Sequence, residues 1–430
     1  MNRHILRLAV PNIISNISIP LLGLADMALL GHLGSEVYLG AIAVGSMVFN
    51  ILYWGFGFLR MGTSGFAAQA YGRRHFTESL QVLARALLVA WGGALLLVVL
   101  QVPIRWAGFS LLDASPEVER WAASYFSIRI FAAPATIGLY AFTGWFIGMQ
   151  DVRSPMFVSI LVNVLNIGLN VLFVFGLGLK SDGVAWGTLM AQYTGLLAAL
   201  WIFRRYYGRL LPYWDPRGLW LRTAFVRFFK VNSDIFLRTL CLIFVFTYFT
   251  SSSAASNNLV LAANTLLLQF FMFFSYLIDG FAYAAEALTG KAIGAKNQAL
   301  LKRSVHLLFV WGIALAVIFT AIYGGLHRQI LQLLTSQEDV LQVAYQYGAW
   351  VVAIPLLSFA SFIWDGVYIG ATASRAMRNT MLIATLGVFV PVEFFLAQTL
   401  GNHALWLALT GFLLARGLAQ TVWARWAIHI

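Results

Sequence analysis

Charged side chains are scarce in this chain: only 10% of its 430 residues are Asp, Glu, Lys or Arg, whereas 60% are hydrophobic. Because a soluble domain carries about 25% charged residues, a soluble globular fold is excluded. The apolar residues stand in continuous runs such as 86–100 and 309–325, and the lack of alternation excludes a transmembrane barrel. With their flanks, these runs approach the roughly 20 residues that a spanning helix needs. The sequence therefore predicts an all-α integral membrane protein.

Cysteine and enzyme motifs are equally sparse. The single cysteine, Cys241, lies inside a predicted span, so an intrachain disulfide is impossible and a metal cluster is not expected. The chain has no phosphate-binding glycine loop followed by lysine, no paired-histidine motif and no GxSxG nucleophile elbow. These absences argue against an ATP-driven pump and against an enzyme, and no cofactor is expected.

Basic residues follow alternate hydrophobic segments. Lys and Arg gather before the first predicted span and after the second, fourth, sixth, eighth and tenth, whereas the intervening loops are acidic, polar or nearly neutral. The positive-inside rule therefore predicts a bacterial-type inner membrane protein with both termini in the cytoplasm. The net charge of +12 reflects this placement, so the expected partner is the lipid bilayer and not nucleic acid.

About twelve spans are predicted, at 8–31, 38–69, 79–102, 121–148, 156–178, 183–204, 231–253, 260–290, 304–325, 341–371, 379–400 and 404–426.

The two halves of the chain are similar to each other. QAYGRRH at 69–75 matches KAIGAKN at 291–297, and LGAI at 39–42 falls opposite LAAN at 261–264 at the same offset. Ordered matches at one spacing indicate an internal duplication. Because six spans are an even number, both copies share one orientation, which is a known transporter plan. The predicted domains are an N-terminal six-helix lobe (1–204), a cytoplasmic linker (205–230) and a C-terminal six-helix lobe (231–430).

One carboxylate, Asp26, stands in the middle of the first hydrophobic segment. An ionised carboxylate in hydrocarbon is costly, so Asp26 must face protein, water or an ion, or stay protonated. It is therefore a functional candidate, and the alternative is a structural carboxylate bonded to a neighbouring helix. Pro20 lies upstream in the same segment, removes a helical hydrogen bond and favours a kink. That kink is either a hinge sensitive to protonation or a static bend.

Amide side chains recur on one face of the fifth predicted span. Asn163, Asn166 and Asn170 are spaced three and four residues apart. Amides in hydrocarbon need partners, so this face indicates an interior seam or a wet cavity. The other polar candidates of this half are Tyr125, Tyr140, Thr188 and Gln192.

The second half has its own ionisable groups within predicted spans. Asp234 and Arg238 are four apart, and this spacing predicts a buried ion pair. Asp279 and Glu286 share a face of the eighth span, and Asp365 lies in the tenth. Converging carboxylates are able to hold a cation through oxygen ligands. The alternative is a polar network of this lobe that pairs with Arg238.

Stretches across nearly the whole chain resemble, in order, the multidrug and toxic compound extrusion (MATE) family and specifically its DinF-like branch. This resemblance implies two pseudo-symmetric six-helix lobes in a V-shaped fold that opens alternately to each side of the membrane. It also implies export of amphiphilic or cationic organic compounds, driven by inward flow of H⁺ or Na⁺. The matching stretches are PNIISNISIPLLGLADMALLGHLG, GFAAQAYGRR, NVLNIGLNVLFVFGLGLKSDGVAWGTLMAQ, NSDIFLRTL, LIDGFAYAAEALTGKAIGAKN, FIWDGVYIGATASRAMRN and GNHALWLALTGFLLARG.

The resemblance assigns roles to particular residues. Asp26 matches the first-span aspartate that forms the proton or cation site of the N-terminal lobe in the family. Asn166, Asn170 and Thr188 match its supporting polar positions, to which we add Tyr125 and Gln192 as further members of the hydrogen-bond network. Many relatives carry Asp where this chain has Asn170, so a single titrating proton site is favoured here. Asp365 resembles an aspartate that belongs to a Na⁺ site in some relatives.

We therefore expect a monomeric, proton-coupled antiporter for multidrug efflux, which exports small amphiphilic or cationic drugs or toxic metabolites in exchange for H⁺. One alternative is a Na⁺-coupled exporter of the same family. A second is a flippase of lipid-linked precursors, which would typically carry a strongly basic central cavity. A third is a membrane receptor or structural protein that transports nothing.

Overall fold

The computed structural model describes the backbone of residues 1–30, 36–110 and 115–428, and side chains are described for 1–23, 37–110 and 115–428. Within these ranges the secondary structure is helical throughout, with no strand, which confirms the predicted all-α class. The helices are α1 (Asn2–Leu30), α2 (Glu36–Gly55), α3 (Gly57–Gly72), α4 (Phe76–Val99), α5 (Gln101–Ser110), α6 (Pro116–Arg129), η1 (Ile130–Ala132), α7 (Ala133–Gly148), α8 (Arg153–Val171), η2 (Leu172–Gly176), α9 (Lys180–Ile202), η3 (Phe203–Tyr207), η4 (Gly208–Tyr213), η5 (Arg217–Trp220), α10 (Arg222–Ser256), α11 (Asn258–Gly294), α12 (Gln298–Leu334), α13 (Glu338–Gly370), α14 (Ser374–Ala384), η6 (Thr385–Phe389), α15 (Val390–Leu400) and α16 (Asn402–Ala427).

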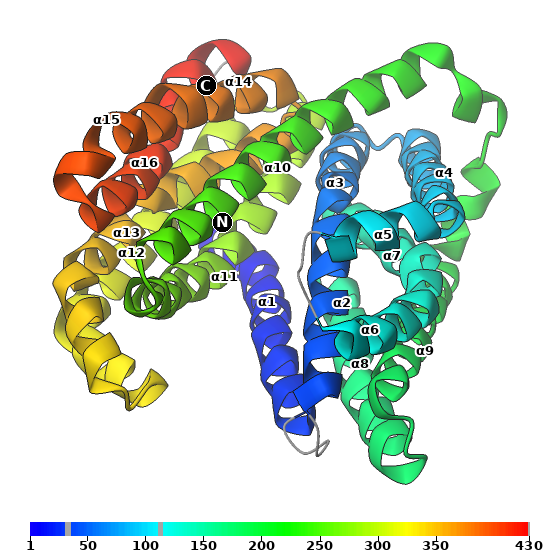
Figure 1. The fold of residues 1–430 in the computed structure, drawn as a ribbon. Helices are drawn as coiled ribbons and strands as arrows, with labels where there is room; N and C mark the ends of the chain where they lie inside the picture. Colours follow the sequence, from blue (N-terminus) through cyan, green and yellow to red (C-terminus); the bar gives the residue numbers. More distant parts are fainter. Residues whose placement is uncertain (31–35, 111–114, 429–430) are drawn as a thin grey trace. The chain divides into compact units, whose positions relative to one another are not determined.

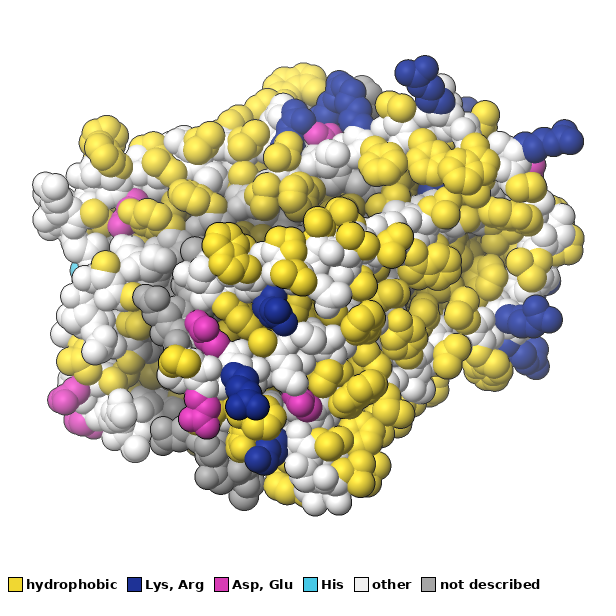
Figure 2. Space-filling model, turned by 45° about the vertical axis from the view of Figure 1, so that its right-hand side comes forward, with side chains coloured by type: hydrophobic (Ala, Val, Ile, Leu, Met, Phe, Trp, Pro, Cys, Tyr) yellow, Lys and Arg dark blue, Asp and Glu magenta, His cyan; other side chains and the backbone are white. Residues whose placement is uncertain are grey.

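Eleven helical segments in the described part of the chain are long and apolar enough to cross a membrane. They fall on eleven of the twelve predicted spans. The remaining prediction, 183–204, falls on α9, a helix of 23 residues whose apolar character is diluted by polar side chains such as Thr188 and Gln192. Hydrophobic side chains cover much of the face drawn in Figure 2. Exposed apolar surface on this scale is typical of a protein that faces lipid, and the chain is a multi-pass membrane protein.

The described chain divides into two compact units (Figure 1). The N-terminal unit is Ile14–Phe228, and the C-terminal unit combines Met1–Ile13 with Phe229–Ile430. The boundary therefore lies inside α1, and the first thirteen residues pack in the C-terminal unit rather than with the remainder of their helix. Helix α1 is continuous from Asn2 to Leu30, so Pro20 does not end it.

Close helix packing repeats in the two units at an offset of 222 residues. In the N-terminal unit, a Cβ atom added to Gly144 of α7 would lie 2.2 Å from the carbonyl oxygen of Arg60 in α3. In the C-terminal unit, a Cβ added to Gly366 of α13 would lie 2.1 Å from the carbonyl oxygen of Ala282 in α11. Glycine at each position lets two helix backbones approach directly. The duplication inferred from short sequence matches thus extends to backbone packing.

Rare backbone conformations repeat at the same offset. Arg74 has φ 57° and Lys296 has φ 53°, each just after the helix that carries a matched motif. Gln150 and Thr372 form a second pair, with φ 65° and 54°. Left-handed backbone is uncommon for residues other than glycine. Two such pairs at one spacing support pseudo-symmetry of the two six-helix lobes.

The glycine contact between α7 and α3 leads to a stability prediction. We expect Gly144→Ala to lower the free energy of unfolding by about 1–3 kcal/mol, because the new methyl group meets a backbone carbonyl that cannot turn aside. Thermal unfolding in detergent measures this. Gly92→Ala in α4 is the matched control, since a Cβ there meets nothing within 4 Å, and alanine in a helix is neutral or stabilising. Equal stability of the two variants would contradict the prediction.

Part of the segment predicted as a linker (205–230), residues 215–219, is packed against α4 of the N-terminal unit. Arg85, buried with only 4% exposure, donates from Nε to the carbonyl oxygen of Leu219 at 3.1 Å and from Nη2 to that of Gly218 at 2.6 Å. Gln81 donates from Nε2 to the carbonyl oxygen of Asp215 at 3.1 Å. These donors satisfy carbonyl groups that a loop leaves unpaired, so the segment is held in place.

Candidate functional site

The N-terminal unit contains a cavity of about 550 Å³ between α1, α2, the end of α6, α7, α8 and α9. Apolar side chains such as Leu22, Trp54 and Val158 line part of it, and hydroxyl and amide groups line the remainder. Mainly apolar walls with a few converging polar groups are typical of sites for small organic molecules. The polar lining residues are Asn50, Tyr53, Arg129, Thr136, Tyr140, Thr143, Ser159, Asn163, Thr188 and Gln192.

A chain of neutral hydrogen bonds runs from this cavity into the contact between α8 and α9. Asn166 donates from Nδ2 to the Thr188 hydroxyl at 3.0 Å, and Thr188 donates in turn to the carbonyl oxygen of Val184 at 2.9 Å. Asn170 donates from Nδ2 to Oδ1 of Asn166 at 3.0 Å. Both asparagines are buried, and Thr188 reaches the cavity. The face predicted by the three- and four-residue spacing is therefore a seam between helices that opens onto a cavity.

One cation, Arg129, lines the same cavity. Its Nη1 donates to the Ser46 hydroxyl at 2.9 Å and to the Tyr125 hydroxyl. Its guanidinium carbon lies 4.9 Å from the centre of the Phe49 ring, which is within range of a cation–π contact. Tyr125 and Ser46 also share a hydrogen bond of 3.1 Å. The guanidinium group is thus fixed in place by neutral groups.

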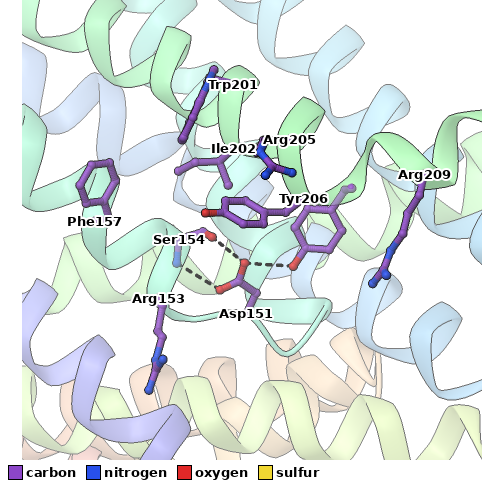
Figure 3. Close-up of a pocket in the computed structure, with 10 residues that line it drawn as sticks. Asp151, Arg153, Ser154, Phe157, Trp201, Ile202, Arg205, Tyr206 and Arg209 are labelled. Atoms are coloured by element: carbon purple, nitrogen blue, oxygen red, sulfur yellow. Dashed lines mark hydrogen bonds between the residues drawn. The ribbon is translucent and has the colours of Figure 1, made fainter.

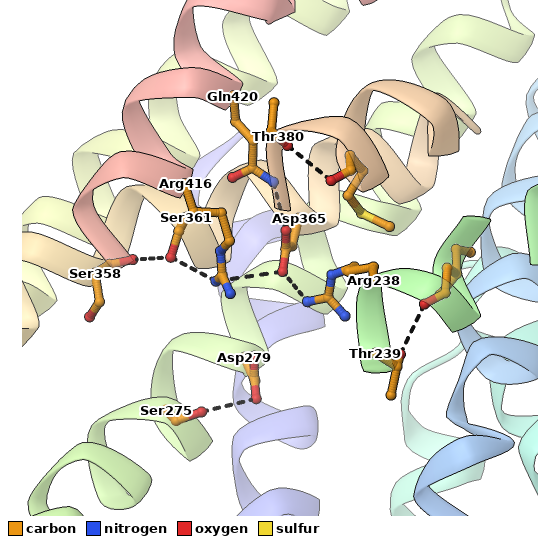
Figure 4. A network of polar contacts seen from close by, with 12 residues as sticks. Arg238, Thr239, Ser275, Asp279, Ser358, Ser361, Asp365, Thr380, Arg416 and Gln420 are labelled. Carbon is orange, nitrogen blue, oxygen red and sulfur yellow. Dashed lines mark hydrogen bonds and ion pairs between the residues drawn. The ribbon is translucent and has the colours of Figure 1, made fainter. Parts of the chain in front are cut away.

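The C-terminal unit contains a buried ionic network centred on Asp365 of α13 (Figure 4). Arg238 of α10 forms an ion pair with Oδ2 of Asp365, and Arg416 of α16 lies 3.6 Å from the same oxygen. Gln420 donates from Nε2 to the other carboxylate oxygen at 2.7 Å, and Arg416 also donates to the Ser361 hydroxyl at 2.7 Å. Helices α10, α13 and α16 are thereby joined through a single carboxylate.

Comparison with known proteins identifies the family. The MatE family profile matches residues 11–172 and 235–395, which is most of the chain and includes both halves. This chain belongs to the MatE family. The DNA damage-inducible protein F of Escherichia coli is 37% identical over 429 residues, covering 97% of this chain and 91% of that protein. The human multidrug and toxin extrusion protein 1 is 24% identical over 418 residues, with 94% and 71% covered.

A solved crystal structure described as MATE in the bent conformation shares the fold, with a TM-score of 0.88 and 20% identity. The alignment covers 100% of this chain and 95% of that one. The predicted resemblance to the multidrug and toxic compound extrusion family and its DinF-like branch is confirmed. The chain is a transporter of a multidrug efflux family and not an enzyme.

In this MatE-family chain, several residues selected from the sequence meet at the cavity of the N-terminal unit. Asn163, Thr188, Gln192 and Tyr140 line it. Asn163 also donates to the Ser18 hydroxyl of α1 at 2.8 Å, which links α8 to the first helix. Gln192 makes no hydrogen bond to any residue that the structure describes.

Two other residues predicted as part of the site in the first lobe, Tyr125 and Asp26, are not seen in the asparagine network. Tyr125, expected in the asparagine network, instead supports Arg129. The reason is that Tyr125 lies in α6 beside α2, whereas the asparagine network lies between α8 and α9. Asp26 belongs to α1, but its side chain lies outside the described residues.

The ion pair predicted between Asp234 and Arg238 is not formed, and that prediction was wrong. Asp234 instead accepts hydrogen bonds from Arg378 at 2.5 Å and from Ser374 at 2.8 Å, both in α14. Arg238 turns to Asp365. A spacing of four residues allows an ion pair along one helix. Here Asp234 is instead bonded by donors on another helix, and Arg238 is paired with a carboxylate on another helix.

The other carboxylates of the C-terminal unit do not converge on a cation site. Asp279 accepts a hydrogen bond of 3.4 Å from Ser275, one turn earlier in α11. Glu286, in the same helix, is buried. Among the described residues, no three His, Cys, Asp or Glu side chains are grouped so as to hold a metal ion. The contacts of Asp365 are those of a polar network with two arginines, which is the second of the two alternatives.

Sequence reasoning did not single out Arg129, Arg416 or Gln420 as functional positions. For the two arginines, the sequence did contain a usable indication: each stands alone within an apolar segment, Arg129 in RIFAAPA and Arg416 in FLLARGLAQ. An ionisable residue at such a position must find a partner inside the protein. The sequence did not identify those partners, since Ser46, which accepts from Arg129, and Ser361, which accepts from Arg416, lie on other helices.

Proposed function

We propose that this MatE-family chain is a secondary active antiporter that exports small amphiphilic or cationic organic compounds in exchange for H⁺. The observation that carries the proposal is the cavity of about 550 Å³ with mixed apolar and polar walls and a neutral hydrogen-bond seam behind it. The name of the human relative, a multidrug and toxin extrusion protein, agrees with this class of substrate. We further propose that the protein acts as a monomer in a bacterial-type inner membrane with both termini in the cytoplasm, which the positive-inside pattern supports.

Asp26 is the proposed proton site. The described residues that line the cavity include no carboxylate. Ile19 and Leu22 of α1 do line it, and Asp26 stands seven and four residues further along the same helix, which is the spacing of one helical face. Protonation would remove the negative charge that attracts a cationic substrate, and the asparagine seam would respond through its hydrogen bonds. Arg129, which is held by neutral groups, would repel a bound cation once the negative charge of Asp26 is gone.

The alternative couplings and functions have weaker support. Asp365, the residue that suggested Na⁺ coupling, is already engaged by Arg238, Arg416 and Gln420. A flippase of lipid-linked precursors would need several basic groups for a pyrophosphate, and Arg129 is the only Lys or Arg among the described lining residues. We therefore favour proton coupling and an organic substrate.

Transport in liposomes with separately imposed ion gradients tests the proposal. We expect an inward H⁺ gradient to drive a lipophilic cationic dye in the opposite direction, whereas a Na⁺ gradient of equal size leaves the dye at equilibrium. The driving force is about 1.4 kcal/mol per pH unit and about 2.3 kcal/mol per 100 mV for each charge moved. One proton exchanged for a singly charged dye moves no net charge, so each pH unit supports a gradient of about tenfold. For a neutral substrate the membrane potential adds to this, and one pH unit with 100 mV supports a gradient of roughly a few hundred-fold. Dye movement that requires Na⁺ and ignores pH would overturn proton coupling.

A further inference from the structure

A second hollow of the N-terminal unit lies between the α7–α8 loop and the end of α9, with a volume of about 860 Å³. It is separate from the cavity described above, since the two share no lining residue. Its walls come from residues 151–157 and 201–209. Both segments include parts predicted to lie on the cytoplasmic side, directly after the fourth and sixth spans. The hollow is therefore expected at the level where lipid headgroups meet the protein.

Three arginines, Arg153, Arg205 and Arg209, line this hollow (Figure 3). None of their guanidinium groups forms a hydrogen bond or an ion pair with any residue that the structure describes. The one carboxylate of the lining, Asp151, is already engaged, because it accepts hydrogen bonds from the Ser154 hydroxyl at 2.5 Å, from the Ser154 amide at 3.1 Å and from the Tyr207 hydroxyl at 3.0 Å. The site therefore keeps a surplus of two positive charges.

The contacts of Asp151 also make the hollow a built site. Burial, reinforced by the neighbouring Asp151, raises the pKa of Tyr207 well above its ordinary value, so the phenol stays protonated and donates. The resulting bond ties the α7–α8 loop to η3, the helical segment that follows α9. The arginines on either side of it are thus carried by two segments that are fixed to each other.

Exposed apolar and aromatic side chains form part of the wall of the hollow. Figure 3 shows Phe157 and Trp201 on the side of the hollow away from Arg209. Phe157 is 53% exposed, Trp201 60% and Tyr206 60%. Trp and Tyr are enriched at the interface between membrane and water, where one part of the ring meets lipid and the other meets water. The hollow thus combines cationic and apolar side chains: Arg205 lies beside Trp201, Arg153 lies on the side of Phe157, and Arg209 lies on the other side (Figure 3).

We infer that this hollow binds an anionic glycerophospholipid of the cytoplasmic leaflet. Its phosphate would lie between Arg205, Arg209 and Arg153, and the first part of an acyl chain would lie along Phe157 and Trp201. Guanidinium groups match phosphate oxygens in geometry and charge, and basic pockets between membrane helices on the cytoplasmic side are suited to anionic headgroups. A free phosphate ion would use the arginines but would gain nothing from the apolar wall.

Binding of short-chain lipids to the full-length protein in detergent tests this inference. The probe is dihexanoyl phosphatidylglycerol, compared with dihexanoyl phosphatidylcholine and with inorganic phosphate, and binding is read by microscale thermophoresis. We expect the anionic lipid to bind at least 10-fold more tightly than the zwitterionic one. We also expect millimolar inorganic phosphate not to displace it. Equal binding of the two lipids would overturn the inference, and efficient displacement by phosphate would show an ion site instead.

Variants of the arginines locate the site. We expect Arg205→Gln to weaken phosphatidylglycerol binding about 5-fold, and Arg153→Gln, Arg205→Gln and Arg209→Gln together to weaken it about 100-fold, on the basis of one headgroup attraction per arginine. Arg204→Gln is the matched control, because Arg204 is an exposed neighbour that does not line the hollow, and it should change affinity by less than two-fold. An equal loss in this control would contradict the inference. The single variant decides the matter if the triple variant does not fold.

Discussion

Asp26→Asn is expected to abolish proton-driven export. Asparagine keeps the shape of the side chain and its hydrogen-bonding capacity but cannot take up a proton at any physiological pH. In the N-terminal unit the described lining of the cavity offers no other carboxylate, and the seam behind it is made of neutral Asn166, Asn170 and Thr188. Nothing else in the proposed site therefore replaces the lost titration. The steady-state gradient of a neutral amphiphilic substrate should fall from roughly a few hundred-fold to about one.

The measurement is substrate accumulation in everted vesicles across a series of imposed pH gradients. In the wild type, accumulation should rise as the compartment that supplies protons is made more acidic, whereas the variant should give a flat profile. Asp182→Asn is the matched control, since Asp182 is a half-buried carboxylate of α9 that accepts a hydrogen bond of 2.9 Å from Ser124 and does not line the cavity. Wild-type dependence on pH in the Asp26 variant would refute its role.

Asp365→Ala is expected to cause the largest loss of stability. The carboxylate is buried between two arginines, Arg238 and Arg416, which are themselves buried. Its removal takes away the carboxylate with which both guanidinium groups form their ion pairs, while both groups stay buried. Breaking a buried ion pair from one side typically costs about 3–5 kcal/mol, because the remaining charge stays buried. For a unit of this size that corresponds to a fall of roughly 6–20 °C in the melting temperature.

Thermal unfolding in detergent measures this effect, and Glu338→Ala provides the control. Glu338 lies in the same helix, is exposed and accepts a hydrogen bond of 3.0 Å from Gln342, so its loss should change stability by less than about 0.5 kcal/mol. Adding Arg238→Leu to Asp365→Ala should recover part of the loss, since one uncompensated charge is then removed. If Asp365 were instead a Na⁺ ligand, Na⁺ would stabilise the wild type and not the variant. An unchanged melting temperature in Asp365→Ala would contradict the structural role.

Local patterns explain which features of the site were predictable. Asn166 and Asn170 were placed on one helix face because helical periodicity follows from spacing alone, and the structure joins them by a hydrogen bond. The repeat offset of 222 residues was readable from QAYGRRH and KAIGAKN, and it recurs in the glycine contacts of Gly144 and Gly366. In each case the information lies within one helix or one short motif.

The all-helical membrane class, eleven of the twelve spans and the duplication could be predicted from the amino-acid sequence. The reason is that the length and apolar composition of each segment decide whether it can lie in lipid. The pairing of side chains between helices, in contrast, depends on how the helices pack against each other. Asp234 forms its ion pair with Arg378, 144 residues away, and not with Arg238, four residues away. Arg238 pairs with Asp365. The rotation and depth at which one helix packs on another set these partners, and neither quantity is encoded in the spacing along a single helix. The same packing places Arg129 on the cavity and the first thirteen residues in the C-terminal unit.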